Sequence, residues 1–171
     1  FGSYGEVYKA ERLRNNEICA VKIIDLLRCS QKYMQKFLPR ELAALMEIRH
    51  ENIIRVYDIF RSNKKIYVFM EFAANGDLAK YLKKHGILSE RRARIWFRQA
   101  CQALYYLHEE MWTAHRDIKI ENFLLNDKWI IKLTDFGFTT DVLDMNDDNV
   151  LSETFCGTLP YYCPQIFRRQ P

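Results

Sequence analysis

The sequence lacks several features by which whole classes of protein are recognised. No stretch approaches the roughly 20 apolar residues that span a bilayer, and no signal peptide opens the chain, so neither a membrane protein nor a secreted protein is expected. The five cysteines form no CxxC pair and are odd in number, which favours reduced thiols in a cytoplasmic protein, with a nuclear location as the alternative. The net charge of +4 is too small to indicate binding of nucleic acid.

The composition is instead that of a folded domain. Of the 171 residues, 49% are hydrophobic and 28% are charged, which excludes a disordered chain and suffices for one domain or two small lobes. The acidic residues are unevenly distributed, because six carboxylates and no Lys or Arg lie between Asp135 and Gln165. Such a segment is either a solvated loop or part of a site whose charge is regulated, and the choice between the two depends on the neighbouring motifs.

Apolar periodicity predicts a small, mostly antiparallel sheet with one helix in the first part of the chain. Residues 6–13 and 17–25 are predicted strands around the turn "RNN", and residues 54–60 and 64–72 are a second strand pair around "RSN". Between the pairs, "PRELAALMEI" (39–48) has a proline suited to a first helical turn. Leu42, Leu45 and Met46 recur there at helical spacing.

The second part of the chain is predicted to be mainly helical. A short helix is expected over residues 77–85, stopped by Gly86, and Ser89 is placed to cap a long helix that runs to about residue 111. The predicted apolar face of the long helix consists of Ala93, Trp96, Phe97, Ala100, Leu104, Leu107 and Met111. Two short strands follow, "FLLN" (123–126) and "WIIKLT" (129–134). We therefore expect an α+β, two-lobed fold with a small sheet lobe (1–72), a hinge (73–76) and a helical lobe (77–171).

Two motifs in the first predicted strands suit the binding of phosphate. "FGSYGEV" places Gly2 and Gly5 three residues apart, and glycines let backbone amides approach phosphate, although a plain strand turn is the favoured explanation of this motif taken alone. In "AVKII", Lys22 faces the opposite side from its apolar neighbours. A functional role for Lys22 requires a carboxylate partner, for which Glu41 is the candidate, and a solvated strand face is the alternative.

The stretches "HRDIKIEN" (115–122) and "LTDFGF" (133–138) are more specific. A predicted strand pair separates Asp117 from Asp135, and this hairpin can return the chain so that Asp117, Asn122 and Asp135 converge. Carboxylate and amide oxygens are hard ligands suited to Mg²⁺. Asp117 is placed to accept the proton of a hydroxyl group, and Lys119 to neutralise a transferring phosphate.

The four motifs in this order resemble the signature set of the eukaryotic protein kinases, and the resemblance covers nearly the whole chain. The resemblance implies that ATP and Mg²⁺ bind and that each motif has a role. It assigns Gly2, Gly5 and Lys22 to the phosphates, Glu41 to pairing with Lys22, Asp117 and Lys119 to catalysis, and Asn122 and Asp135 to the metal. It also assigns Val7, Ala20 and Leu124 to the adenine pocket, Met70 to its back, Glu71 and Ala73 to the hinge backbone, and Asp77 to the ribose. Met70 and Asp77 also suit a core position and a helix cap, and His115 and Phe136 are better explained as packing residues, with Leu45 and Val56.

The resemblance extends to the serine/threonine branch, because Lys119 and Thr158 match its residues. It is greatest to the testis-specific serine kinases, through "GSYGEVYKA", "KFLPREL" and "LSETFCGT" among other stretches. It implies that Thr154 is phosphorylated and paired by Arg116. An unmodified loop threonine is the alternative, and Thr140 stands where many relatives carry a basic residue. Asp77 and Glu121 imply a preference for Arg or Lys before the target residue, unless they are simply solvated acids.

Two departures from the family pattern qualify this prediction. The chain has Cys163-Pro164-Gln165 where the family has Ala-Pro-Glu, and Gln165 cannot form the ion pair of that glutamate, so we expect the activation segment to be anchored differently. The chain ends at Pro171, before further helices of the family, and it does not begin with Met. We therefore expect a partial sequence of a longer kinase. A catalytically inactive pseudokinase scaffold and a non-functional gene fragment are the alternatives.

Overall fold

The computed structural model describes residues 5–29, 31, 34, 38–137, 140–141 and 156–168. Within its helices and strands it describes the backbone but not the side chains of Arg40, Glu41, Ala44, Thr140 and Asp141. Gly2 and Thr154 lie outside the described residues, as do most of the acidic residues after Asp141.

A four-stranded antiparallel sheet forms the first part of the molecule. Its strands are β1 (Gly5–Arg12), β2 (Glu17–Asp25), β3 (Val56–Ser62) and β4 (Lys65–Glu71), in the spatial order β1-β2-β4-β3. The two hairpin turns contain Asn16 and Asn63, whose positive φ angles of 55° and 53° suit asparagine better than most residues. Each of the four predicted strands is confirmed.

One helix, α1 (Leu38–Glu47), follows a short 3₁₀ turn, η1 (Leu26–Arg28). Leu38 is buried with the apolar residues of the sheet, and Leu42 and Leu45 pack against the same cluster. Met46 is exposed, so the prediction that it shares the apolar stripe with Leu42 and Leu45 is wrong. Consecutive residues of a helix are about 100° apart around its axis. Because Leu45 faces the sheet, Met46 lies on a side of the helix that does not.

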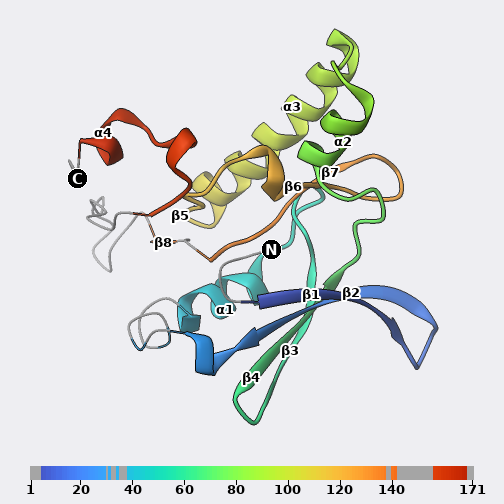
Figure 1. The fold of residues 1–171 in the computed structure, drawn as a ribbon, viewed down its shortest axis with the longest axis vertical. Helices are drawn as coiled ribbons and strands as arrows, with labels where there is room; N and C mark the ends of the chain where they lie inside the picture. Colours follow the sequence, from blue (N-terminus) through green and yellow to red (C-terminus); the bar gives the residue numbers. More distant parts are fainter. Residues whose placement is uncertain are drawn as a thin grey trace.

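The second part contains α2 (Leu78–His85) and α3 (Glu90–Tyr105), which continues into a π-helical turn, η3 (Tyr106–Glu110). Figure 1 shows these helices at one end of the molecule and the sheet at the other. The Asp77 carboxylate caps α2 by accepting from the Lys80 amide at 2.8 Å, and Gly86 ends that helix with a φ of 77°. Ser89 caps α3 as predicted.

The prediction that Phe97 belongs to the apolar face of α3 is wrong, because this residue is 73% exposed. The buried residues of α3 and of the π-helical turn that continues it are Trp96, Ala103 and Leu107. These three residues recur at intervals of seven and four, which keeps them in line along one face. Phe97 follows Trp96 directly and therefore lies about 100° around the helix from that line.

Short elements complete the fold. The predicted strand pair is observed as the antiparallel pair β6 (Phe123–Leu125) and β7 (Ile131–Leu133), preceded by a 3₁₀ turn, η4 (Ile120–Asn122). A second small pair joins β5 (Thr113–Ala114) to β8 (Thr140–Asp141). The chain then forms a 3₁₀ turn, η5 (Leu159–Tyr161), and a four-residue helix, α4 (Pro164–Phe167).

Two buried clusters hold the parts together. One lies in the sheet and the other between α3, β6 and β7, and Leu45 packs against both. Two crossing segments also bond to the hairpin β6–β7. The amide of Ile54 donates to the carbonyl of Leu133 at 2.9 Å, and that of Asn75 donates to the carbonyl of Leu125 at 2.9 Å. In the described ranges, no helix has the length and apolar character that crossing a membrane requires.

Candidate active site

The catalytic-loop residues predicted from "HRDIKIEN" are brought into direct contact. The Asp117 side chain is only 4% exposed, and three donors surround its carboxylate. Thr158 Oγ1 donates to Asp117 Oδ1 at 2.6 Å, while Lys119 Nζ at 2.7 Å and Asn122 Nδ2 at 3.1 Å approach Oδ2. Lys119 Nζ also donates to Thr158 Oγ1 at 2.8 Å, so that Asp117, Lys119 and Thr158 form a closed triangle of hydrogen bonds.

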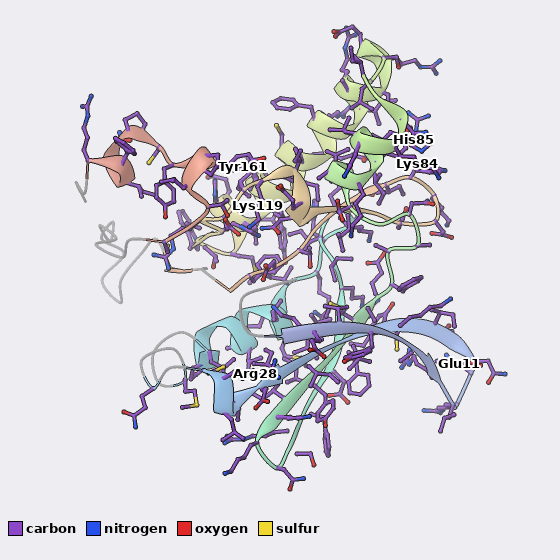
Figure 2. The ribbon with its side chains drawn as sticks, in the orientation of Figure 1. Glu11, Arg28, Lys84, His85, Lys119 and Tyr161 are labelled. Carbon is purple, nitrogen blue, oxygen red and sulfur yellow. The ribbon has the colours of Figure 1, made fainter. Side chains whose placement is uncertain are left out.

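This set of donors determines the protonation state of Asp117. Burial by itself favours the neutral acid, but the hydrogen bonds from Lys119, Thr158 and Asn122 and the charge of Lys119 outweigh it, so the pKa of Asp117 lies below its ordinary value. Asp117 is therefore an ionised carboxylate at neutral pH, the state in which a carboxylate can accept a proton. Figure 2 labels Lys119 in this loop and Tyr161 in the C-terminal segment, and the hydrogen bond from Lys119 to Thr158 joins the loop to that segment.

His115 holds the loop of Asp117 in place through hydrogen bonds of its ring. It is buried, and its ring lies 5.1 Å from that of Phe136. His115 Nδ1 accepts from the Asp117 amide at 3.3 Å, so Nε2 carries the proton and donates to the Thr134 carbonyl at 3.0 Å. Burial lowers the pKa of His115, which keeps the ring neutral. These contacts agree with the prediction that His115 and Phe136 pack rather than react.

Lys22 extends from the sheet to the loop that follows β7. Lys22 Nζ lies 3.3 Å from Asp135 Oδ1, across 113 residues of sequence, and both side chains are partly buried. The register of β1, β2 and β4 puts Val7 and Val68 opposite Lys22, on the same face of the sheet. The lysine is therefore not on a solvated strand face. The predicted pairing with Glu41 concerns a side chain outside the described set and stays a prediction.

The predicted metal ligands Asn122 and Asp135 lie on segments that a backbone hydrogen bond joins. Asn122 Nδ2 donates to both the backbone carbonyl (2.8 Å) and the carboxylate of Asp117, which leaves the amide oxygen of Asn122 for a cation. The Thr134 amide donates to the Asn122 carbonyl at 2.9 Å, which ties the residue before Asp135 to the loop of Asn122. Asp135 has a φ of 66°, a conformation that turns its carboxylate off the strand direction. Oxygen ligands of this kind fit Mg²⁺.

The predicted adenine residues lie where the two parts of the molecule meet. Ala20 and Met70 are opposite one another in β2 and β4 and are buried in the sheet cluster. Leu124, from β6, and Ala73 pack against the same cluster. Val7 lies on the same sheet face as Ala20 but is 58% exposed. Gly5 has a packing reason to be glycine, since a Cβ atom there would lie 2.8 Å from the Ile23 carbonyl oxygen.

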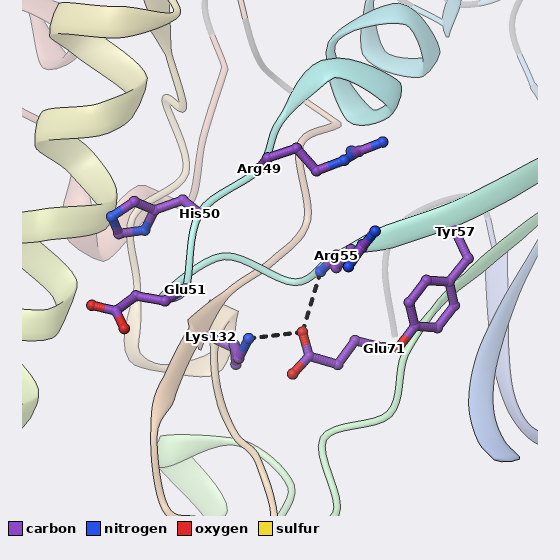
Figure 3. A pocket seen from close by; sticks show the side chains of 7 residues that line it. All are labelled: Arg49, His50, Glu51, Arg55, Tyr57, Glu71 and Lys132. Carbon is purple, nitrogen blue, oxygen red and sulfur yellow. Dashed lines mark hydrogen bonds and ion pairs between the residues drawn. The ribbon is translucent and has the colours of Figure 1, made fainter.

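One charged pair was missed by the sequence analysis. Lys132 Nζ lies 2.8 Å from Glu71 Oε2, and the two side chains are 11% and 19% exposed (Figure 3). The Arg55 amide donates to the same Glu71 oxygen at 3.3 Å. This pair joins the end of β4 to β7 and thus links the two parts of the molecule. A lysine inside the apolar strand "WIIKLT" was the signal that could have revealed it.

The segment around Thr158 is the last component of the site. Gly157 has a φ of 107°, and a Cβ atom there would lie 2.9 Å from the Arg116 carbonyl oxygen, so only glycine allows this approach. Burial raises the pKa of the Cys156 thiol, and the nearby Arg116 opposes this effect. Gln165 is exposed at the start of α4. Thr154, the predicted phosphorylation site, is outside the described residues.

Fold and site together define a two-lobed protein in which a sheet lysine reaches an acid beside a buried aspartate, the arrangement expected of a protein kinase. The family described as protein kinase domain matches residues 1–171, and the chain belongs to this family. The predicted kinase resemblance and the predicted fold class are thereby confirmed.

The curated relatives agree with the more detailed resemblance. The chain is 38% identical to human testis-specific serine/threonine-protein kinase 4, over 99% of this chain and 55% of the relative. It is 42% identical to mouse testis-specific serine/threonine-protein kinase 1, over 99% of this chain and 47% of the relative. It is 36% identical to Aurora kinase B-A of Xenopus laevis, over 96% of this chain and 44% of the relative. The chain spans about half the length of the curated relatives it matches.

Proposed function

We propose that this chain is the catalytic part of a serine/threonine protein kinase, which transfers the γ-phosphoryl group of ATP to a protein hydroxyl group. The observation that carries the proposal is the buried, ionised carboxylate of Asp117, held by Lys119, Thr158 and Asn122. The Lys22–Asp135 contact supports a phosphate site beside it. In this proposal, residues 1–72 are the small lobe, 73–76 the hinge and 77–171 the start of the large lobe.

Each residue has a defined part in the transfer. The acceptor oxygen bonds to the γ-phosphorus, its proton passes to Asp117, and the bond from that phosphorus to the β–γ bridging oxygen breaks. Lys119 stabilises the charge of the transferring group, and Lys22 orients the α- and β-phosphates. Asn122 and Asp135 would hold Mg²⁺, which neutralises charge on the phosphates. Gly2, Gly5, Val7, Ala20, Met70, Glu71, Ala73, Asp77 and Leu124 complete the proposed ATP site, with Glu41 as partner of Lys22.

The proposed protein substrate carries a Ser or Thr preceded by basic residues. Glu121 supports this preference, because it is exposed beside the catalytic loop. Asp77 supports it less, since Lys80 Nζ lies 2.8 Å from its Oδ2 atom and neutralises it. Phosphorylation of Thr154, paired by Arg116, is the proposed activating event. Five free cysteines, two of them exposed, support a reducing compartment such as the cytoplasm or the nucleus.

A pseudokinase scaffold is the competing function, and it requires a missing or misplaced catalytic group. The contacts of Lys22, Asp117 and Asp135 argue against it. The test is transfer of radiolabelled phosphate from ATP to a serine peptide by the full-length protein. Wild type is expected to transfer label, and Asp117→Asn to lose roughly 1,000-fold or more of the rate, as general-base removal does. Equal transfer by both proteins would remove Asp117 from the mechanism.

A further inference from the structure

A groove beside the Glu71–Lys132 ion pair carries arginine side chains that the proposed transfer does not use. It begins at a hollow of about 470 Å³ lined by residues 49–51, Arg55, Tyr57, Glu71 and Lys132 (Figure 3). A second hollow of about 430 Å³ shares Arg49, Arg55 and Tyr57 with the first and adds Arg12 and Glu17. A third, of about 300 Å³, shares Arg12 and Tyr57 and extends to Phe69. The three adjoining hollows make the groove elongated.

Pairing of the charges that line the three hollows leaves Arg49 and Arg55 in the first two hollows, Glu51 in the first and Asp58 in the third. Lys132 is neutralised by Glu71 at 2.8 Å, and Arg12 by Glu17 at 3.2 Å. Within the described part of the chain, the guanidinium groups of Arg49 and Arg55 have no carboxylate partner. Both line the first and the second hollow, and Figure 3 shows their side chains extending to the same side. The carboxylate of Glu51 extends to the opposite side in that view.

The backbones that carry these two arginines are held in place by side chains from distant parts of the sequence. The Arg49 amide donates to Tyr106 Oη at 3.0 Å, and Arg49 Nη1 donates to the Ile48 carbonyl at 2.7 Å. The Arg55 amide donates to Glu71 Oε2, and the Glu71 amide donates to the Arg55 carbonyl at 2.8 Å. The backbone positions of two like charges are thus fixed beside one hollow, and an anion between the two guanidinium groups would relieve their repulsion.

Tyr57 adds a hydrogen-bond donor to the same wall. Burial raises the pKa of its hydroxyl above the ordinary value of 10, and Arg55 and Arg12 only partly offset this. The hydroxyl therefore keeps its proton near neutral pH. Two guanidinium groups with five donors each and one phenol match a phosphate dianion better than a single carboxylate.

We propose that this groove binds a phosphorylated segment of a partner protein, with the phosphoryl group between Arg49 and Arg55 and the flanking residues along Tyr57 toward Phe69. A peptide is favoured over a free phosphate ion because the hollows continue for a distance that an ion leaves empty. The groove thus serves as a docking site for a phosphorylated substrate or regulator. The inference does not depend on the proposed phosphoryl transfer, because none of its anion-binding side chains belongs to the catalytic set.

Titration calorimetry with the full-length protein tests the proposal. The probes are the peptide Ala-Phe-Ala-phosphoserine-Ala-Phe-Ala, the same peptide with unmodified serine, and inorganic phosphate. The variant Arg49→Ala/Arg55→Ala is compared with Arg61→Ala, an exposed arginine of β3 outside the three hollows. The phosphopeptide is expected to bind wild type and Arg61→Ala alike, at least tenfold more tightly than the serine peptide, and to lose at least tenfold in affinity on the double variant.

Three results would overturn the proposal. One is equal affinity of the phosphopeptide for wild type and for the double variant. Another is equal affinity of the phosphorylated and unmodified peptides. The third is binding of inorganic phosphate as tight as that of the phosphopeptide, which would identify a free-anion site. Circular dichroism of each variant checks folding, and a single variant, Arg55→Lys, keeps the charge while removing the fork of donors if the double variant fails to fold.

Discussion

Thr158 donates a 2.6 Å hydrogen bond to Asp117 across 41 residues of sequence, and in doing so it ties the segment 156–168 to the proposed catalytic carboxylate. The same hydroxyl oxygen accepts from Lys119 at 2.8 Å. The position of the acid and that of the lysine therefore both depend on where the C-terminal segment lies. A displaced segment would leave both groups without a shared partner.

Replacing Thr158 by alanine is expected to slow phosphoryl transfer by roughly 10- to 100-fold, since a hydrogen bond to a charged group is worth about 1.5–3 kcal/mol. The expected loss is in kcat more than in KM for ATP, because Thr158 contacts the proposed general base Asp117 and not the proposed nucleotide residues. Thr158→Ser keeps the hydroxyl group and is expected to retain most of the activity. Equal rates for the alanine and serine variants would show that the hydroxyl does not position Asp117.

The Lys132–Glu71 pair is expected to stabilise the junction of the two parts. Lys132→Met leaves the Glu71 carboxylate without its cation in a largely buried position, which is expected to lower the free energy of unfolding by about 2–3 kcal/mol. The reason is the desolvation of the remaining charge, so Glu71→Gln/Lys132→Met is expected to recover part of the loss. Urea denaturation of wild type, both single variants and the double variant gives the coupling energy.

Lys128→Met is the matched control for that measurement. Lys128 is an exposed lysine in the turn between β6 and β7, and its removal is expected to change stability by less than about 0.5 kcal/mol. A Lys132→Met protein as stable as the Lys128→Met protein would show that the pair contributes nothing to the junction.

Much of the fold was predictable from local sequence. The turns at Asn16 and Asn63, the caps at Asp77 and Ser89 and the stop at Gly86 are local signals, and the elements they delimit were predicted correctly. The errors concern which side of an element is buried. Phe97 and Met46 are apolar but exposed, and the residues before them, Trp96 and Leu45, are the ones that pack against the core. Which of two adjacent apolar residues is buried depends on tertiary packing.

The site was predictable only in part. Asp117, Asn122 and Lys119 lie in one loop, and their contact follows from a spacing that the sequence displays. The pairing of Lys132 with Glu71 joins strands 61 residues apart, and the direct contact of Lys22 with Asp135 spans 113 residues. Such contacts depend on how the two parts of the molecule meet, which periodicity along the chain does not reveal.

His115 is expected to make stability fall as the pH is lowered. Its pKa in the native protein is below the ordinary 6.5 because it is buried, so the unfolded chain binds the proton more readily than the folded one. The free energy of unfolding is therefore constant for this group above about pH 6.5 and decreases below it. Burial also lowers the pKa of His50, which adds a contribution of the same sign.

Thermal unfolding between pH 8 and pH 5 measures this dependence. His115→Gln is expected to be less stable than wild type at pH 8, because it loses hydrogen bonds, but to show a shallower decrease toward pH 5. His108→Gln replaces an exposed histidine and is expected to follow wild type at every pH. Parallel curves for wild type and His115→Gln would contradict the assignment of a neutral, buried His115.

Gly157→Ala separates backbone strain from crowding in the segment that carries Thr158. Its Cβ atom would lie 2.9 Å from the Arg116 carbonyl oxygen, in addition to the strain of a φ of 107°. Gly76 also has a positive φ, 71°, but a Cβ atom there would meet no heavy atom within 4 Å. Gly76→Ala is thus expected to cost about 1 kcal/mol of stability and to leave the rate of phosphoryl transfer nearly unchanged.

Gly157→Ala is expected to reduce that rate by roughly tenfold or more, because the backbone shift that relieves the clash moves Thr158 away from Asp117. Its loss of stability should resemble that of Gly76→Ala, since Cys156 is the one buried residue among residues 156–168. Rates from radiolabel transfer and free energies from urea denaturation are compared for the two variants. If both alanine variants lose activity in proportion to stability, the close approach of Gly157 to Arg116 serves folding alone, and Thr158 is positioned by other contacts.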